Sequence, residues 1–203
     1  MTNITVCEKC GRKIHTKDPN RPRTSDGRNI IDKYFGWTNE DINKDLKGKS
    51  NNFSVVICNT EMNINIGTII RSANAFGARN VVLYGSKRFD RRGTCGAHHY
   101  CNMIYCKNID DFKYILSRDA FIIGAENNII SDIYLNEFTW PIHSHIYIIF
   151  GHETNGIPTE LLNICNKKIT IRQSGATRSL NVAVAASIFM YDFLSKMTIF
   201  DNK

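Results

Sequence analysis

Residues 53–85 read FSVVICNTEMNINIGTIIRSANAFGARNVVLYG, two apolar runs on either side of a helical one. The first run, FSVVICN, is short and rich in β-branched residues, which predicts a strand. The segment after it, residues 63–76, carries apolar side chains at helical spacing: Ile66, Ile69, Ile70, Ala73 and Phe76. Gly77 follows as a helix stop, and NVVLYG predicts a second strand. The stretch is therefore a strand–helix–strand unit.

The same alternation continues towards the C-terminus. Six segments predict, in order, a helix, two strands, a short helix, a strand and a helix of small residues: IDDFKYILSRD, AFIIGA, HIYIIFG, PTELLNIC, KKITIR and VAVAAS. This order, with apolar strands, predicts an α/β fold with a mostly parallel sheet flanked by helices on both faces. Ligands of such folds bind at the carboxyl ends of the strands. Polar segments with glycine follow four of the strands and mark that edge: GSKRFDRRG, GAEN, GHETNG and RQSGATRS.

Length and composition limit the class of protein. The chain has 203 residues, of which 42% are hydrophobic and 22% charged, as in one globular domain with a short appendage. Its longest apolar run, IYIIF, is too short to cross a bilayer, and MTNITVCEKCGRK lacks the apolar centre of a signal peptide. Seven cysteines, an odd number, argue against a disulfide framework. We therefore expect an intracellular, cytoplasmic protein that does not associate with membranes.

The net charge of +7 is concentrated in two segments. Residues 1–50 hold 11 basic and 7 acidic residues, a charge of +4, and residues 87–92 hold four basic and one acidic residue, a charge of +3. Excess charge gathered in two places favours an anionic partner, and a phosphate backbone is the partner it fits best. The alternative is a basic solubilising tail and one basic loop.

Residues 1–50 differ from the rest of the chain and are expected to form a basic, partly flexible N-terminal extension, with residues 51–203 as the main domain. The sequence Cys7-Glu8-Lys9-Cys10-Gly11 is half of a zinc knuckle, and His15 is the one nearby third ligand. Zinc needs four ligands, and the chain has no second C-x-x-C. Two reduced cysteines are therefore favoured over a metal site.

Three polar segments after strands carry the candidate chemistry, and the first is Asn65-Ile66-Gly67-Thr68-Ile69-Ile70-Arg71. Six helical steps separate Asn65 from Arg71 by about 120°, so the two side chains do not share a face. Asn65 is interpreted as the helix-entry residue, with Arg71 almost two turns further along. Arg71 either forms a salt bridge at the rim or binds an anion.

The second segment, residues 151–156, follows a buried strand and reads GHETNG. Two glycines around a carboxylate allow a tight turn and a close approach of the backbone to a ligand. The third segment, Ile171–Asn181, leads into the helix of Ala and Val. A simpler interpretation of its end is that Ser179 or Asn181 caps that helix.

In this order, the three segments resemble motifs of the SpoU (TrmH-like) branch of the SPOUT superfamily of RNA methyltransferases. The first motif is Asn65-x-Gly67-x-x-x-Arg71, the second is Gly151-x-Glu153-x-x-Gly156, and the third runs from Ile171 through Ser179-Leu180-Asn181-Val182. The resemblance covers about residues 53–196. It implies a deep trefoil knot in the C-terminal half, S-adenosyl-L-methionine as cofactor, and a homodimer whose sites borrow residues from the partner. It further implies methyl transfer to a ribose 2′-hydroxyl of RNA.

The resemblance also assigns roles. The catalytic and substrate-binding cluster would comprise Asn65, Arg71, Glu153, Ser179 and Asn181, and the cofactor would lie against Ala125, Gly151, Ile171, Leu180 and Asn181. Because a guanidinium stays protonated, we interpret Arg71 as a cation that stabilises the phosphate and the developing alkoxide rather than as the base.

The segment from Phe89 to Tyr100, FDRRGTCGAHHY, mixes bases, aromatic residues and glycines, as loops that grip RNA do. Its candidate RNA contacts, with the residue that precedes it, are Arg88, Arg91, Arg92, His98 and His99. Transfer RNA is favoured over ribosomal RNA as the substrate. Two alternatives remain: an RNA-binding protein of this fold without catalysis, and a methyltransferase that modifies a base. A dinucleotide-binding oxidoreductase is excluded because no G-x-G-x-x-G follows the first strand.

Overall fold

The computed structural model describes residues 4–6, 13–15, 29–58, 62–127 and 131–201. The chain divides into two compact units, Met1–Thr38 and Asn39–Lys203. In the first unit, β1 (Ile4–Val6) pairs antiparallel with β2 (Lys13–His15), and a 3-10 turn, η1, spans Asp32–Tyr34. The second unit begins with α1 (Asn39–Lys47), so this helix groups with the larger unit. The expected boundary after residue 50 stays a prediction.

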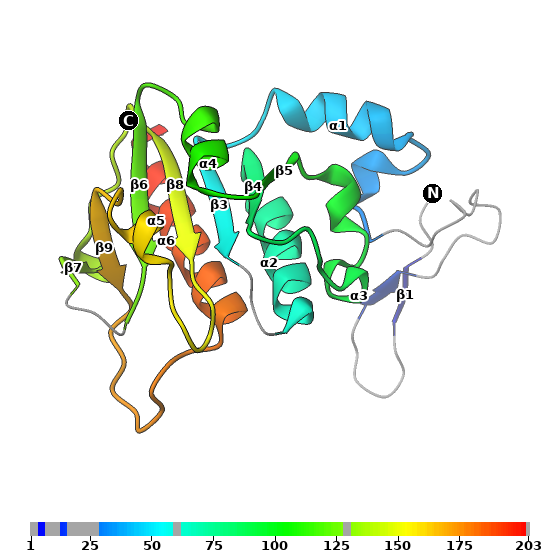
Figure 1. The fold of residues 1–203 in the computed structure, drawn as a ribbon. Coiled ribbons are helices and arrows are strands. Elements are labelled where there is room, and N and C mark those ends of the chain that lie inside the picture. Colours follow the sequence, from blue (N-terminus) through cyan, green and yellow to red (C-terminus); the bar gives the residue numbers. More distant parts are fainter. Residues whose placement is uncertain (1–3, 7–12, 16–28, 59–61, 128–130, 202–203) are drawn as a thin grey trace. The chain divides into compact units, whose positions relative to one another are not determined.

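A seven-stranded sheet forms the centre of the larger unit, in the order β5-β4-β3-β8-β6-β9-β7 (Figure 1). The strands are β3 (Phe53–Cys58), β4 (Asn80–Tyr84), β5 (Met103–Cys106), β6 (Ala120–Ala125), β7 (Ile133–Tyr134), β8 (His145–Phe150) and β9 (Lys167–Thr170). Every neighbouring pair is parallel. The predicted α/β fold with a mostly parallel sheet is confirmed.

Both faces of the sheet are covered, which explains why the central strands are apolar at consecutive positions. All six residues of β3 and all six of β8 are buried. On one face lie α2 (Asn63–Ala75) and α6 (Val182–Asp201), where Ile69 and Phe189 join the same buried cluster as Val55. On the other face lie α4 (Ile109–Ile115) and α5 (Thr159–Leu162), packed on residues such as Val56 (Figure 1).

Several elements differ from the expectation. The helix predicted over IDDFKYILSRD ends at Ile115, and α5 is a single turn that Pro158 precedes as its N-cap. The short elements α3 (Arg91–Thr94), η2 (Ala97–Tyr100) and η3 (Leu135–Glu137), and the strands β5 and β7, were not anticipated. Each is too short to show a helical or strand period in the sequence. The trefoil knot stays a prediction, and within the described residues no helix combines the length and apolarity of a bilayer crossing.

At the amino-terminal edge of the sheet, a buried polar network connects the starts of β3, β4 and β8. The Nδ1 of His145 lies 3.0 Å from the Oδ1 of Asn52, and its Nε2 lies 2.8 Å from the hydroxyl of Ser54. The side-chain amide of Asn80 donates to the same hydroxyl at 2.9 Å. Because Asn52 donates its amide to the carbonyl of Ser144, its oxygen is the acceptor, and His145 is assigned the neutral tautomer with the proton on Nδ1.

This network predicts a loss of stability at mildly acidic pH. Burial, assisted by the charge of Arg79, lowers the pKa of His145 to about 4 from 6.5. The neutral form is therefore favoured in the folded chain, so its contribution is fully present above pH 6.5 and is lost as the pH falls towards 4. Between pH 7 and pH 5 the free energy of unfolding should drop by about 2 kcal/mol more in the wild type than in His145→Gln. Urea unfolding at both pH values measures it, with the exposed His143→Gln as the control, and equal drops in wild type and His145→Gln would contradict it.

Candidate functional site

The three candidate segments converge at the carboxyl edge of the sheet through a chain of side-chain hydrogen bonds. Asn65, in the first turn of α2, is buried, and its amide donates to the Oε1 of Glu153 at 2.7 Å. The amide of Asn181, just before α6, donates to the Oδ1 of Asn65 at 3.2 Å. Asn65 is thus linked to Glu153, 88 positions later in the chain, and to Asn181, 116 positions later.

Asn181 also caps α6. Its Oδ1 accepts the backbone N–H groups of Ala183 at 2.9 Å and Val184 at 3.3 Å. The capping interpretation therefore holds for Asn181, whose oxygen accepts from the helix start while its amide donates to Asn65. Among the described residues, Ser179 makes no hydrogen bond that caps α6. Its side chain is exposed and lines a pocket.

A pocket lies where the ends of β6, β8 and β9 meet the start of α6. Four of the five residues expected at the cofactor line it, namely Ala125, Gly151, Ile171 and Leu180. Asn181 is instead part of a neighbouring groove between α2 and α6, which Asn65 also lines. We call this second hollow the α2–α6 groove.

The loop from Gly151 to Ile157 is the tightest part of the pocket. His152 and Gly156 exchange two backbone hydrogen bonds of 2.9 and 2.8 Å, which close the loop on itself. A Cβ on Gly151 would overlap the backbone of Gly156 and Ile157. Gly156 has a φ of +68°, where glycine is favoured, and a Cβ there would overlap the carboxylate of Glu126. Close backbone packing therefore requires glycine at position 151, and the positive φ favours it at position 156.

Glu126 holds this loop and was not predicted as a site residue. Its Oε2 accepts the N–H of Ile157 at 3.1 Å, and its Oε1 accepts the N–H of Asn127 at 2.9 Å. The carboxylate thus ties the end of β6 to the loop after β8. Its segment, GAEN, is one of the four polar segments that follow predicted strands. That placement is the signal in the sequence that could have identified Glu126.

The chemistry of the pocket fits the cofactor expected from the resemblance. Among the described lining residues, the two with a formal charge are both acidic, Glu126 and Glu153. The remainder is largely apolar side chain and loop backbone, with the side chains of Phe150 and Ile169 among the lining. Such a site suits a ligand with positive charge and a planar group that stacks on apolar walls. S-adenosyl-L-methionine, a sulfonium ion with an adenine ring, has both features.

Arg71 lies two turns beyond Asn65 on α2, as predicted. Its side chain is exposed, and its Nη1 donates to the sulfur of Cys95 at 3.3 Å. Cys95 follows α3 with a φ of +46°, so a turn of unusual backbone geometry holds the acceptor. Arg71 is therefore connected to the α3 turn, whereas the hydrogen bonds of Asn65 lead to Glu153 and Asn181.

The expected RNA-binding residues gather on and beside α3 and η2. Arg88 and Arg91 are exposed, and Arg92 pairs with Asp90 at 2.6 Å. His98 lies 2.7 Å from the hydroxyl of Thr94, and burial, followed by the charges of His99 and Arg91, lowers its pKa. His98 is therefore neutral at pH 7 and held inside the turn, whereas His99 is exposed.

No group of three or more His, Cys, Asp or Glu side chains that could hold a metal is found in the part of the chain that the structure describes. Cys7 and Cys10, and the side chain of His15, lie outside that part.

The model of the SpoU rRNA Methylase family matches residues 52–191, which contain all three candidate segments up to Asn181. The chain belongs to this family. The family's match begins within two residues of the start of β3 and ends inside α6, so it coincides with the sheet and the helices that cover it.

Relatives of this SpoU-family chain include enzymes named for two kinds of RNA. The 23S rRNA (guanosine-2'-O-)-methyltransferase RlmB of Photobacterium profundum is 24% identical over 165 residues, 78% of this chain and 66% of the relative. The tRNA (guanosine(18)-2'-O)-methyltransferase of Borreliella burgdorferi is 26% identical over 159 residues, 77% of this chain and 72% of the relative. The chain spans 53–66% of the length of four RlmB relatives.

Solved structures agree in fold. The A. aeolicus TrmH/SpoU tRNA modifying enzyme has a TM-score of 0.68 at 22% identity, covering 80% of this chain and 86% of that one. The SpoU methyltransferase AviRb from Streptomyces viridochromogenes, solved in complex with the cofactor AdoMet, has a TM-score of 0.64 at 21% identity, covering 71% of this chain and 57% of that one. The parallel sheet and its flanking helices are thus those of the SpoU family.

Proposed function

We propose that this chain transfers a methyl group from S-adenosyl-L-methionine to a ribose 2′-hydroxyl of RNA. The observation that carries the proposal is the hydrogen-bonded chain from Glu153 through Asn65 to Asn181, placed beside a pocket whose charged lining residues are acidic. The names of relatives that methylate the 2′-oxygen of guanosine in ribosomal and transfer RNA support it.

The bound cofactor would supply an electrophilic methyl group, so the protein has to hold the acceptor in line and stabilise charge as the hydroxyl loses its proton. Backbone around Gly151, Ile171 and Leu180, together with Ala125, would hold the cofactor. Because Glu153 takes one amide hydrogen of Asn65, the amide is fixed in one orientation. The remaining donor and lone pair of that amide would orient the ribose hydroxyl.

Arg71 would supply positive charge to the phosphate next to the reacting ribose and to the developing alkoxide. The guanidinium stays protonated at ordinary pH, so the proton would leave through the phosphate or water. Ser179, exposed at the pocket, would position the acceptor nucleotide, and Asn181 would hold the start of α6 and the third segment in place.

Transfer RNA remains the preferred substrate in this proposal, and the relatives' names include both RNA classes. Mapping ribose methylation in cells with and without the gene for this protein tests the proposal. We expect one or a few 2′-O-methyl sites in transfer RNA to disappear. Loss in ribosomal RNA would correct the substrate, loss of a base methylation would favour the base-modifying alternative, and unchanged methylation would favour an RNA-binding protein without catalysis.

The basic N-terminal extension, residues 1–50, is proposed to help recruit RNA, since it carries a charge of +4.

A second copy of the chain is proposed as partner, seated on the α2–α6 groove. Three apolar side chains of α6 lie exposed at helical spacing, Val184, Ile188 and Tyr191, with 50, 36 and 64% of their surface accessible. They line the groove together with Asn65 and Asn181. An exposed apolar face favours association, and a copy docked here would border the candidate site.

Replacing Ile188 by aspartate should convert the dimer into a monomer, because the carboxylate would be buried without a partner at the interface. Sedimentation velocity of the wild type and the variant measures it. Tyr114→Asp is the matched control, since Tyr114 is 91% exposed on α4, on the other face of the sheet. A monomeric wild type, or a variant that stays dimeric, would contradict the proposal.

A further inference from the structure

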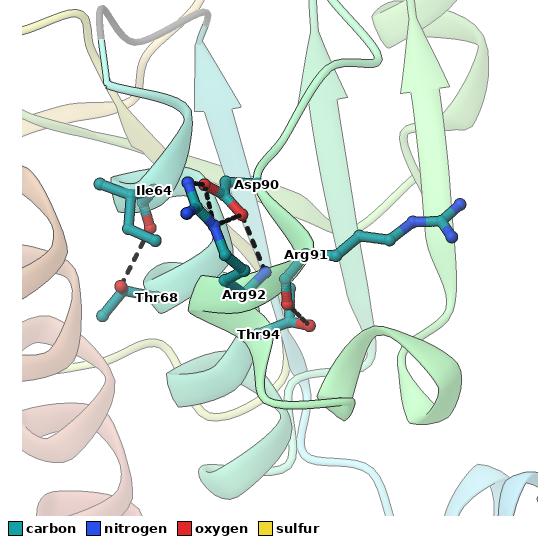
Figure 2. Close-up of polar contacts among 6 residues, drawn as sticks. All are labelled: Ile64, Thr68, Asp90, Arg91, Arg92 and Thr94. Atoms are coloured by element: carbon teal, nitrogen blue, oxygen red, sulfur yellow. Dashed lines mark hydrogen bonds and ion pairs between the residues drawn. The ribbon is translucent and has the colours of Figure 1, made fainter. Parts of the chain in front are cut away.

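The adjacent residues Arg91 and Arg92 have different surroundings (Figure 2). The guanidinium of Arg92 folds back on Asp90, with Nη2 at 2.6 Å from Oδ2 and Nε at 3.1 and 3.0 Å from the two oxygens. Asp90 also accepts the backbone N–H of Arg92 at 2.9 Å and so caps α3. Hydrogen bonds from Arg92 lower the pKa of Asp90. The charge of Arg92 is therefore already compensated inside the turn.

Arg91 extends away from this pair (Figure 2). Its side chain is exposed, and among the described residues its guanidinium has no hydrogen bond or ion pair. The turn is closed beneath it by Thr94, whose hydroxyl donates to the carbonyl of Arg91 at 2.8 Å. Arg91 lines a hollow together with Lys87 and Arg88, and Asn63 at the start of α2 forms another side of it.

The charge balance of this hollow is positive. Lys87, Arg88 and Arg91 contribute three positive charges, and Asp90, the acidic lining residue, is paired with Arg92. Lys87 lies 4.6 Å from the centre of the Tyr105 ring, a cation–π contact that leaves its ammonium charged. An anion that enters the hollow would therefore meet cations that the described turn does not neutralise.

The turn is fixed to α2 by a backbone contact between two glycines. A Cβ on Gly67 would overlap the carbonyl oxygen of Asp90, and a Cβ on Gly93 would lie 2.7 Å from the carbonyl oxygen of Ile64. The N–H of Asp90 donates to the carbonyl of Asn63 at 3.0 Å. The hydroxyl of Thr68 donates to Ile64 at 3.0 Å, within the same turn of α2 (Figure 2). Because Asn65 lies on this turn of the helix, these backbone contacts fix the position of the hollow relative to Asn65.

We propose that this hollow binds one phosphate of the RNA backbone through Lys87, Arg88 and Arg91, and that Arg92 is a positioning residue that shapes it through Asp90. The inference rests on the proposed function, since it names where that function's substrate is gripped. A phosphate held here would be kept at a fixed distance from Asn65, which sets the register of the RNA at the candidate site.

RNA binding without cofactor tests the proposal. Fluorescence anisotropy with a labelled transfer RNA transcript, repeated over a series of KCl concentrations, gives the affinity and its salt dependence. For Arg91→Gln we expect a dissociation constant raised about 3- to 10-fold and a slope of log K against log salt shallower by about 1, because one phosphate contact is lost. The melting temperature should not change, since the side chain is exposed.

Arg92→Gln should also lower affinity, because the carboxylate of Asp90 would then face the hollow unpaired, but it should leave the salt slope unchanged, because Arg92 binds Asp90 and is not itself a phosphate ligand. Arg92→Lys should restore the wild-type affinity by keeping the ion pair. Arg118→Gln is the matched control: it removes the same charge from an exposed residue before β6, at the opposite edge of the sheet, and should change neither quantity.

Equal flattening of the salt slope by Arg91→Gln and Arg92→Gln would overturn the division of roles, and an unchanged slope in Arg91→Gln would overturn the phosphate site. A wild type that does not bind RNA would overturn it as well. If the wild type transfers methyl groups and Arg91→Gln leaves the salt slope unchanged, the phosphate site is refuted and the proposed function is not. RNA binding that depends on Arg91, in a protein that transfers no methyl group, refutes the proposed function and leaves the phosphate site standing.

Discussion

Gly151→Ala is expected to weaken the binding of S-adenosyl-L-methionine by roughly 100-fold or more, because the proposed cofactor site consists largely of loop backbone and would be lost if the loop opened. The added Cβ would overlap the backbone of Gly156 and Ile157, none of which is a flexible side-chain end that could turn aside. The loop would have to open, which would separate the N–H of Ile157 from Glu126 and remove the wall of the pocket.

Isothermal titration calorimetry with the cofactor measures this effect. Gly175→Ala is the matched control, because Gly175 lies in the third segment and a Cβ there would meet nothing within 4 Å. Far-ultraviolet circular dichroism should show that both variants keep the sheet and helices. Wild-type affinity in Gly151→Ala would contradict the assignment of this loop to the cofactor.

Asn65→Ala is expected to lower the rate of methyl transfer by roughly 100-fold while cofactor affinity changes little. Asn65 does not line the pocket proposed for the cofactor, so its loss removes the link between Glu153 and Asn181 rather than a wall of that pocket. Asn65→Asp should be equally inactive, because its carboxylate would face that of Glu153, where the amide now donates.

Single-turnover rates with saturating cofactor separate this chemical effect from binding. Asn74→Ala is the control, since Asn74 lies on the same helix and donates to the carbonyl of Tyr100 instead. A fast Asn65→Ala variant, or one whose defect lies in cofactor affinity, would show that Asn65 does not position the acceptor.

The sheet could be predicted because each of its central strands, and the helix between two of them, is encoded in its own short stretch of sequence. Strands buried on both faces read as unbroken apolar runs, as β3 and β8 do, and the helix of α2 shows its period plainly before Gly77 ends it. The polar ends of those strands meet at one edge by the geometry of any parallel sheet. That Asn65 and Asn181 would be near each other follows from this geometry.

The hydrogen-bond and ion-pair partners of individual side chains could not be predicted, because hydrophobic periodicity in the sequence does not reveal them. Arg91 and Arg92 are equivalent in the sequence, and the capping of α3 by Asp90 is what separates them. That turn packs closely on α2 because Gly67 and Gly93, 26 positions apart in the chain, let the two backbones approach. Glu126 matters through the N–H of Ile157, on a loop from a neighbouring strand. Such long-range contacts come from tertiary packing.

The most direct measurement is the fate of the methyl group. Purified protein is incubated with S-adenosyl-L-methionine carrying a labelled methyl group and with transfer RNA transcripts, and the RNA is digested to nucleosides and separated by mass. We predict label in a 2′-O-methylnucleoside, at a bond that resists alkaline cleavage of the RNA. Label on a base, or none in RNA although the cofactor binds, would contradict ribose methylation at the Asn65 site.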